Sequence, residues 1–182
     1  AGRGHGFERP LHRGLGGVEV EDQLRGVAHL RSLPWIDPAR VGVYGWSYGG
    51  YLSLLLMMRG PEAFAAGVAG APVTDWRLYD THYTERYLGH PREAPEAYEA
   101  GNVLRHAEGL RGRLLLIHGM ADDNVLFTHS TLLIDRLTKL DKRFEVLPWP
   151  GAKHGALRFP ETGRHGWNTI LDFFDRHLGA AR

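Results

Sequence analysis

A serine, two neighbouring aspartates and a histidine occur along this chain where a hydrolase could use them. Ser47 lies in the segment GWSYG, with glycines two residues before and two residues after it. Asp122 and Asp123 follow the apolar segment RLLLIHG, and His154 follows the segment FEVLPWP. A serine hydroxyl becomes a strong nucleophile when a histidine accepts its proton and an acid orients that histidine. The set therefore predicts acyl transfer through a serine.

The pattern G-x-S-x-G predicts a sharp turn from a strand into a helix. Such a turn strains the backbone of Ser47 and exposes its hydroxyl, and a Cβ atom at Gly45 or Gly49 is expected to collide within it. The N–H of Tyr48, at the start of the helix, would then be free to donate to an oxyanion. A simpler reading, in which Ser47 only caps the helix, stays open at this point.

The acid and the histidine are expected at the carboxyl ends of their strands, where parallel sheets place their chemistry. Sequence position does not separate Asp122 from Asp123, and Asp122 could also be only a turn residue. His118, just inside a strand end, is expected to be structural. A metal site built from His118, both aspartates and His154 is disfavoured because their spacing matches no known ligand motif.

The elements that would hold these residues alternate between strands and helices. Apolar strands are expected at RVGVYG (40–45), FAAGVAGA (64–71), RLLLIHG (113–119) and FEVLPWP (144–150). Helices are expected over 18–33, 47–59, 129–140 and 166–178, short helices over 72–112, and a loop over 1–17. The helix over 18–33 carries apolar residues at helical spacing, at Val20, Leu24, Val27, Leu30 and Leu33. Apolar strands alternating with helices predict an α/β fold with a four-stranded parallel sheet covered on both faces.

Composition excludes several classes of function. The 182 residues carry a formal net charge of +1, which gives no reason to expect a nucleic acid or an anionic membrane as partner. There is no cysteine, so disulfides, thiolate metal sites and a cysteine nucleophile are excluded. Nucleotide-binding glycine motifs and H-E-x-x-H are missing, so neither a cofactor nor a metal is expected. No apolar run is long enough to span a bilayer, and the compartment stays undetermined.

Four segments resemble the prolyl oligopeptidase family of serine peptidases, most of all its dipeptidyl peptidase IV branch. They are GWSYGGY, APVTDWRLYDTHYTERYLG (71–89), HGMADDNV (118–125) and GRGHGF near the start. The resemblance covers essentially the whole chain and implies an α/β-hydrolase fold. It also implies that Ser47 is the nucleophile, His154 the base and Asp122, rather than Asp123, the acid.

The resemblance further implies a pocket that accepts proline. Its residues would be Tyr48, Val73, Trp76, Tyr79, Tyr83 and Val125, with Asn124 contacting a substrate backbone carbonyl. An apolar slot with aromatic walls suits a pyrrolidine ring, which has no donor of its own. Spacing alone would favour ordinary core packing for these aromatic residues.

Three functions follow from these observations. The first is a serine peptidase that cleaves peptides after proline. The second is an acylaminoacyl peptidase or esterase with the same nucleophile and base, for which the aromatic segment would have no purpose. The third is a binding or assembly domain without activity, which loss of Ser47, Asp122 or His154 would favour, and all three are present.

The chain is expected to be the carboxyl-terminal portion of a longer hydrolase, with a propeller domain and the first strands of the sheet preceding Ala1. A second oxyanion donor would be lost with them, which commonly costs about 10²–10³ in kcat, so this piece is expected to be weak or inactive alone. The sheet edge beside RVGVYG would also be unpaired, which favours self-association, including a homodimer.

Overall fold

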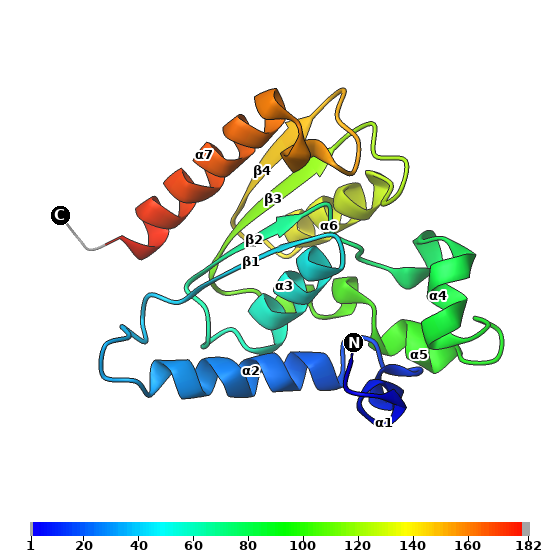
Figure 1. The fold of residues 1–182 in the computed structure, drawn as a ribbon. Coiled ribbons are helices and arrows are strands. Elements are labelled where there is room, and N and C mark those ends of the chain that lie inside the picture. Colours follow the sequence, from blue (N-terminus) through cyan, green and yellow to red (C-terminus); the bar gives the residue numbers. More distant parts are fainter. Residues whose placement is uncertain (1, 180–182) are drawn as a thin grey trace.

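The structure, a computed structural model, describes residues 2–179 and contains one sheet of four parallel strands in the order β1-β2-β3-β4. The strands are β1 (Gly42–Trp46), β2 (Ala66–Gly70), β3 (Arg113–Gly119) and β4 (Phe144–Trp149). In register, Gly70 lies opposite Trp46 on one side and Ile117 on the other. The four arrows point the same way in Figure 1, so the loops that follow the strands share one end of the sheet.

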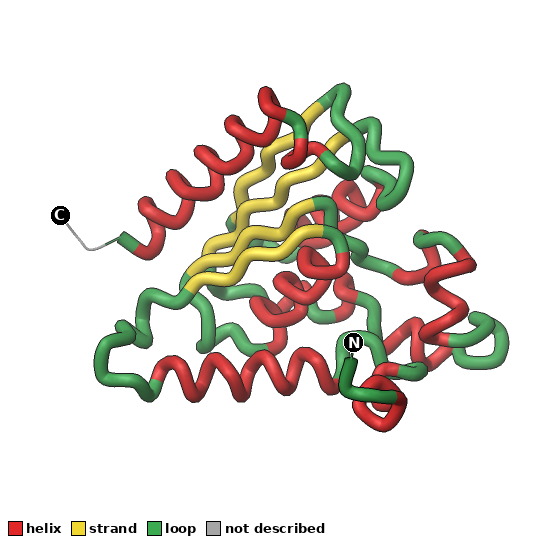
Figure 2. The backbone as a smooth tube through the Cα atoms, viewed as in Figure 1, coloured by secondary structure: helices red, strands yellow, loops and turns green. Residues whose placement is uncertain are grey.

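Helices connect the strands. The α-helices are α1 (His5–Glu8), α2 (Val18–Arg31), α3 (Tyr48–Arg59), α4 (Thr81–Leu88), α5 (Pro95–Ala100), α6 (Thr128–Lys139) and α7 (Pro160–Leu178). Short 3-10 helices span Arg9–Leu11, Trp76–Leu78, Val103–Arg105, Ala107–Gly109 and Ala156–Arg158. Figure 2 shows α7 on one face of the sheet, with α3 and α6 on the other.

Both faces of β3 are buried, which explains its unbroken apolar sequence. Leu114 and Leu116 belong to the larger core, which also contains α3 residues such as Leu54. Leu115 and Ile117 belong to the smaller core, which contains Phe173 and Ile170 of α7. The α/β class and the parallel sheet covered on both faces are therefore as the sequence predicts.

The structure corrects three details of the sequence analysis. The segment expected as a loop over 1–17 contains α1 and a 3-10 turn, but α1 buries no residue, so it left no apolar period to detect. The last helix begins at Pro160 rather than Gly166. Leu30, expected on the apolar stripe of α2, is 48% exposed, whereas Val20 is fully buried and Leu24 and Val27 pack partly buried against the larger core.

No helix within residues 2–179 is both long and apolar enough to cross a membrane. β1 and β4 are the outer strands of the sheet. The side chain of Tyr44 on β1 is 36% exposed.

Candidate active site

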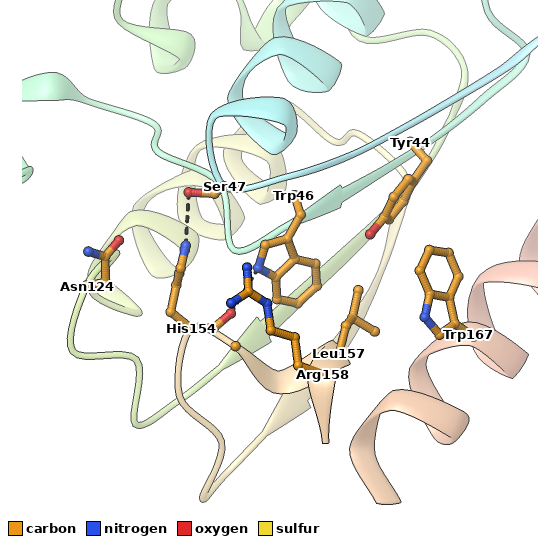
Figure 3. Close-up of a pocket in the computed structure, with 9 residues that line it drawn as sticks. Tyr44, Trp46, Ser47, Asn124, His154, Leu157, Arg158 and Trp167 are labelled. Atoms are coloured by element: carbon orange, nitrogen blue, oxygen red, sulfur yellow. Dashed lines mark hydrogen bonds between the residues drawn. The ribbon is translucent and has the colours of Figure 1, made fainter. Parts of the chain in front are cut away.

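Ser47 is the single residue between β1 and α3, and its backbone has φ 59° and ψ −117°. A non-glycine residue is rare in this region, which costs of order 1–3 kcal/mol of strain. Its N–H donates to the carbonyl of Gly70 at 2.8 Å, which ties the corner to the end of β2. The side chain makes no capping bond to α3; its Oγ lies 2.9 Å from Nε2 of His154 (Figure 3). The reading of Ser47 as only a helix cap is therefore wrong.

The two glycines of the motif have different roles. A Cβ on Gly45 would lie 2.1 Å from the carbonyl oxygen of Gly49, closer than any real contact, so the corner requires glycine at position 45. A Cβ on Gly49 would meet nothing within 4 Å. The expected collision is thus present at Gly45, and the expectation for Gly49 was wrong because its Cβ would point into open space.

Asp122 lies in the loop after β3, and the main chain holds its carboxylate. Oδ1 accepts the N–H groups of Asn124 and Val125, each at 2.9 Å, and Oδ2 lies 2.8 Å from Nδ1 of His154. Burial alone would raise the pKa of Asp122, but hydrogen bonds from His118, His154 and Asn124 outweigh it and hold the pKa well below its usual range. The carboxylate is therefore ionised at neutral pH.

Asp123 points away from this array. Its carboxylate forms an exposed ion pair with Lys153 at 2.6 Å, and this contact lowers the pKa of Asp123. The structure thus brings Ser47, His154 and Asp122 into one hydrogen-bonded series.

The loops that carry Asp122 and His154 are bonded to each other and to β1. The N–H of Met120 donates to the carbonyl of Trp149 at 2.8 Å, and that of Ala121 to Ala152 at 3.1 Å. The indole Nε1–H of Trp46 donates to the carbonyl of His154 at 2.9 Å. Trp46 precedes Ser47 directly, and the sequence analysis did not single it out because the motif leaves its position free.

Tyr48 is the first residue of α3, so its N–H has no acceptor within the helix and lies at the positive end of the helix dipole. Its side chain is half-buried and donates its hydroxyl hydrogen to Oε1 of Glu19 at 2.7 Å. Burial and the hydrogen bond to Glu19 raise the pKa of Tyr48 far above its usual value. The phenol is therefore neutral.

The four aromatic residues predicted for the pocket belong to one aromatic cluster, defined here as Tyr48, Tyr51, Trp76, Tyr79, Tyr83 and Tyr87. Trp76 stacks on Tyr83 with ring centroids 5.9 Å apart, and Tyr79 meets both rings edge-on. Trp76, Val73 and Val125 are 2% exposed or less and belong to the larger core, whereas Tyr48, Tyr79 and Tyr83 are half-buried.

A hollow of about 320 Å³ opens beside this cluster. Tyr48, Tyr83 and Tyr87 line it together with Gly49 and Leu52. Burial raises the pKa of Tyr83 to about 12, so its phenol is also neutral in this hollow. Of the predicted residues, Tyr48 and Tyr83 line this hollow, while Val73, Trp76 and Val125 lie in the larger core.

Asn124 connects this cluster to Ser47. Its Oδ1 accepts the hydroxyl hydrogen of Tyr79 at 2.9 Å, which leaves its amide N–H groups to donate elsewhere. Asn124 also lines an open hollow of about 850 Å³ that contains Ser47 and His154 (Figure 3). The rest of the lining, which the sequence analysis missed, is formed by Tyr44, Trp46, Gly155, Leu157, Arg158 and Trp167.

The residues from 2 to 179 include no group of three or more His, Asp or Glu side chains arranged to hold a metal ion. The four residues considered for a metal site instead contact one another by hydrogen bonds or, at Asp123, pair with a lysine.

The buried histidine His129 lies beside the site but is not hydrogen-bonded to Ser47, His154 or Asp122. Its Nδ1 accepts the N–H of Thr74 at 3.0 Å, and its Nε2 has no hydrogen-bond partner within the described part of the chain. Burial lowers the pKa of His129 to about 4. A buried imidazole that stays neutral makes folding depend on pH.

We expect the free energy of unfolding to fall as the pH drops from about 6.5 to 4. In this range His129 binds a proton in the unfolded chain but stays neutral in the folded chain. The loss from His129 should reach about 3 kcal/mol. In His129→Asn the amide oxygen can still accept the N–H of Thr74 but does not titrate, so the slope should flatten. Urea titrations of both proteins at several pH values measure this, and equal slopes would contradict it.

Comparison with known proteins places these features in a family. The sequence model of the prolyl oligopeptidase family matches residues 1–181. Human dipeptidyl peptidase 8 is 41% identical over 182 residues, which cover 98% of this chain and 20% of that protein. The crystal structure of dipeptidyl peptidase 4 from Porphyromonas gingivalis superposes with a TM-score of 0.93 at 35% identity, covering 97% of this chain and 25% of that one.

Another relative is described as inactive. Inactive dipeptidyl peptidase 10 of Mus musculus is 36% identical over 179 residues, which are 95% of this chain and 22% of that protein. The chain thus spans about a fifth to a quarter of the length of the relatives it matches.

Proposed function

The chain belongs to the prolyl oligopeptidase family, and from that premise we propose that it carries the nucleophile, base and acid of a serine peptidase of the dipeptidyl peptidase kind. One observation carries the proposal: Ser47 Oγ lies 2.9 Å from His154 Nε2, and His154 Nδ1 lies 2.8 Å from Asp122 Oδ2. Since a relative of similar identity is described as inactive, this geometry supports activity more directly than family membership does.

In the proposed reaction, His154 accepts the proton of Ser47 as Oγ bonds to the substrate carbonyl carbon. The ionised Asp122 stabilises the imidazolium that forms. The negative charge moves to the carbonyl oxygen, where the N–H of Tyr48 and the start of α3 can stabilise it. His154 then gives the proton to the leaving amine and an acyl-enzyme results. Water, deprotonated by His154, releases the acid and restores Ser47.

We further propose that the residue before the cleaved bond is proline. The half-buried rings of Tyr48, Tyr79 and Tyr83 all contact the ring of Trp76, and Tyr48 directly follows Ser47 in the chain. Val73, Trp76 and Val125 lie in the larger core. Such aromatic walls suit a pyrrolidine ring, which has no donor of its own. The amide of Asn124, oriented by Tyr79, is free to donate to a substrate carbonyl.

A fluorophosphonate probe, which an activated serine hydroxyl attacks with loss of fluoride, tests the nucleophile. We expect the chain to be labelled, although slowly, because a second oxyanion donor is expected to be missing. Ser47→Ala should lose labelling completely, and Ser32→Ala should keep it, because Ser32 is an exposed residue at the end of α2. Mass spectrometry of the adduct locates it. A folded wild-type chain that stays unlabelled would overturn the proposal.

The proline preference is tested by protection from the same probe. An Ala-Pro boronic acid should protect Ser47 at concentrations about tenfold lower than an Ala-Leu boronic acid does, since a fitted pocket contact discriminates by 10–200-fold. Equal protection would instead favour an acylaminoacyl peptidase or esterase.

A further inference from the structure

His118, the next-to-last residue of β3, lies directly behind the carboxylate of Asp122. Its side chain is fully buried, and so is that of Asp122. Nε2 of His118 lies 3.2 Å from Asp122 Oδ2 and 2.9 Å from the carbonyl oxygen of Val125. Nδ1 lies 2.7 Å from Oγ of Ser130, near the start of α6.

These contacts determine where the imidazole of His118 carries its proton. Nε2 faces a carboxylate oxygen and a carbonyl oxygen, which can only accept, so Nε2 must be the donor. Nδ1 of a neutral ring is then an acceptor, and the hydroxyl of Ser130 can donate to it. Ser130 thus favours the tautomer that points a hydrogen at Asp122.

The carboxylate of Asp122 is fully occupied as a result. Its Oδ1 holds two backbone N–H groups, and its Oδ2 is shared between His154 and His118. A carboxylate offers about four acceptor positions, and all four are filled. Without His118, the contacts at Oδ1 would remain, but the carboxylate could rotate about them and move Oδ2 away from His154.

We propose that His118 is a positioning residue: its Nε2–H, with the tautomer set by Ser130, holds Asp122 Oδ2 in line with His154. This inference rests on the proposed function, because positioning matters to a reaction only if Ser47 and His154 perform one. The ring also packs edge-on against Phe127, with centroids 5.4 Å apart, so loss of packing must be separated from loss of the donor.

Two amide variants make this separation. In His118→Gln the amide nitrogen can occupy the place of Nε2 and still donate to Asp122. In His118→Asn it reaches only the place of Nδ1, near Ser130. Both variants lose the aromatic contact with Phe127, so the position of the donor is the main difference between them.

The first measurement is the rate of labelling by the fluorophosphonate probe. We expect His118→Asn to lower the rate at least about tenfold and His118→Gln to stay within about threefold of the wild type, since hydrogen bonds to charged groups are the strong ones. Equal losses in the two variants, with folds intact, would show that His118 acts through packing and would overturn the proposal.

The second measurement does not depend on activity. The hydrogen on Nδ1 of His154 is shared with Asp122, and its downfield NMR signal in histidine-labelled protein reports that contact. We expect the signal in the wild type and in His118→Gln, and its loss in His118→Asn. An unlabelled wild type that shows this pattern would contradict the proposed function but not the positioning, whereas an unchanged signal in His118→Asn would overturn the positioning.

If neither variant folds, Ser130→Ala leaves the ring in place and removes only the bond that sets its tautomer. The signal of His154 should then weaken, and labelling should slow by a few fold. An unchanged signal and rate in Ser130→Ala would overturn the assigned role of Ser130 and, with it, the proposal.

Discussion

Replacing Asp122 with asparagine should lower the labelling rate of Ser47 by about 10⁴-fold while the fold stays intact, as the same change does in other serine–histidine–aspartate sites. The two N–H groups at Oδ1 require an oxygen there, so the amide nitrogen of the asparagine must take the place of Oδ2. It would then point its hydrogens at His154 and hold that ring in the wrong tautomer. The second-order rate constant for the fluorophosphonate probe measures the loss.

Asp123→Asn is the matched control. The carboxylate of Asp123 forms an exposed pair with Lys153, and exposed pairs contribute little to stability, so we expect a rate within about twofold of the wild type. A large loss in Asp123→Asn, or a small one in Asp122→Asn, would show that the acid has been assigned to the wrong neighbour.

Gly45→Ala should destabilise the chain by more than about 4 kcal/mol, or prevent folding, because its new Cβ would overlap the carbonyl oxygen of Gly49 at 2.1 Å. The corner cannot easily relax, since the N–H of Ser47 is bonded to Gly70. Soluble yield and the urea midpoint measure the effect.

Gly49→Ala changes the motif's other glycine by the same single methyl group. It lies in the first turn of α3 with open space around its Cβ, so the substitution should be neutral or stabilise by up to about 1 kcal/mol. A Gly45→Ala protein that unfolds at the same urea concentration as Gly49→Ala would mean that the corner is much looser than described.

The fold was predictable where apolar side chains mark both faces of an element. β3 spans Arg113–Gly119, as expected, because its apolar run is buried on both faces. The first turns of α7 were missed because they pack through glycine. A Cβ on Gly163 would lie 2.7 Å from the carbonyl oxygen of Leu157, and Gly166 approaches Trp149 just as closely. A glycine allows close packing because it has no side chain, and it therefore adds no apolar residue to the helical pattern of the sequence.

The candidate site was predictable at the level of loops rather than of atoms. Strand ends and the glycine motif indicated where Ser47, His154 and an aspartate would meet. The choice between Asp122 and Asp123 depends on which way one turn directs two adjacent side chains, and only the family resemblance favoured Asp122. A histidine inside an apolar strand is unusual, so the sequence offered a weak sign that His118 has a specific role. It offered no sign for its partner Ser130, because a sequence does not show which helix start lies beside which strand end.

The strained backbone at Ser47 lowers the stability of the fold, whereas the proposed reaction needs the hydroxyl that serine provides. Glycine accepts φ 59° without the penalty that serine pays, so selection for thermal robustness alone would favour glycine at position 47. A single Ser47→Gly substitution should therefore relieve this strain and at the same time remove the proposed nucleophile. Under the proposed function, serine stays at this position despite the cost in stability because the reaction needs its hydroxyl.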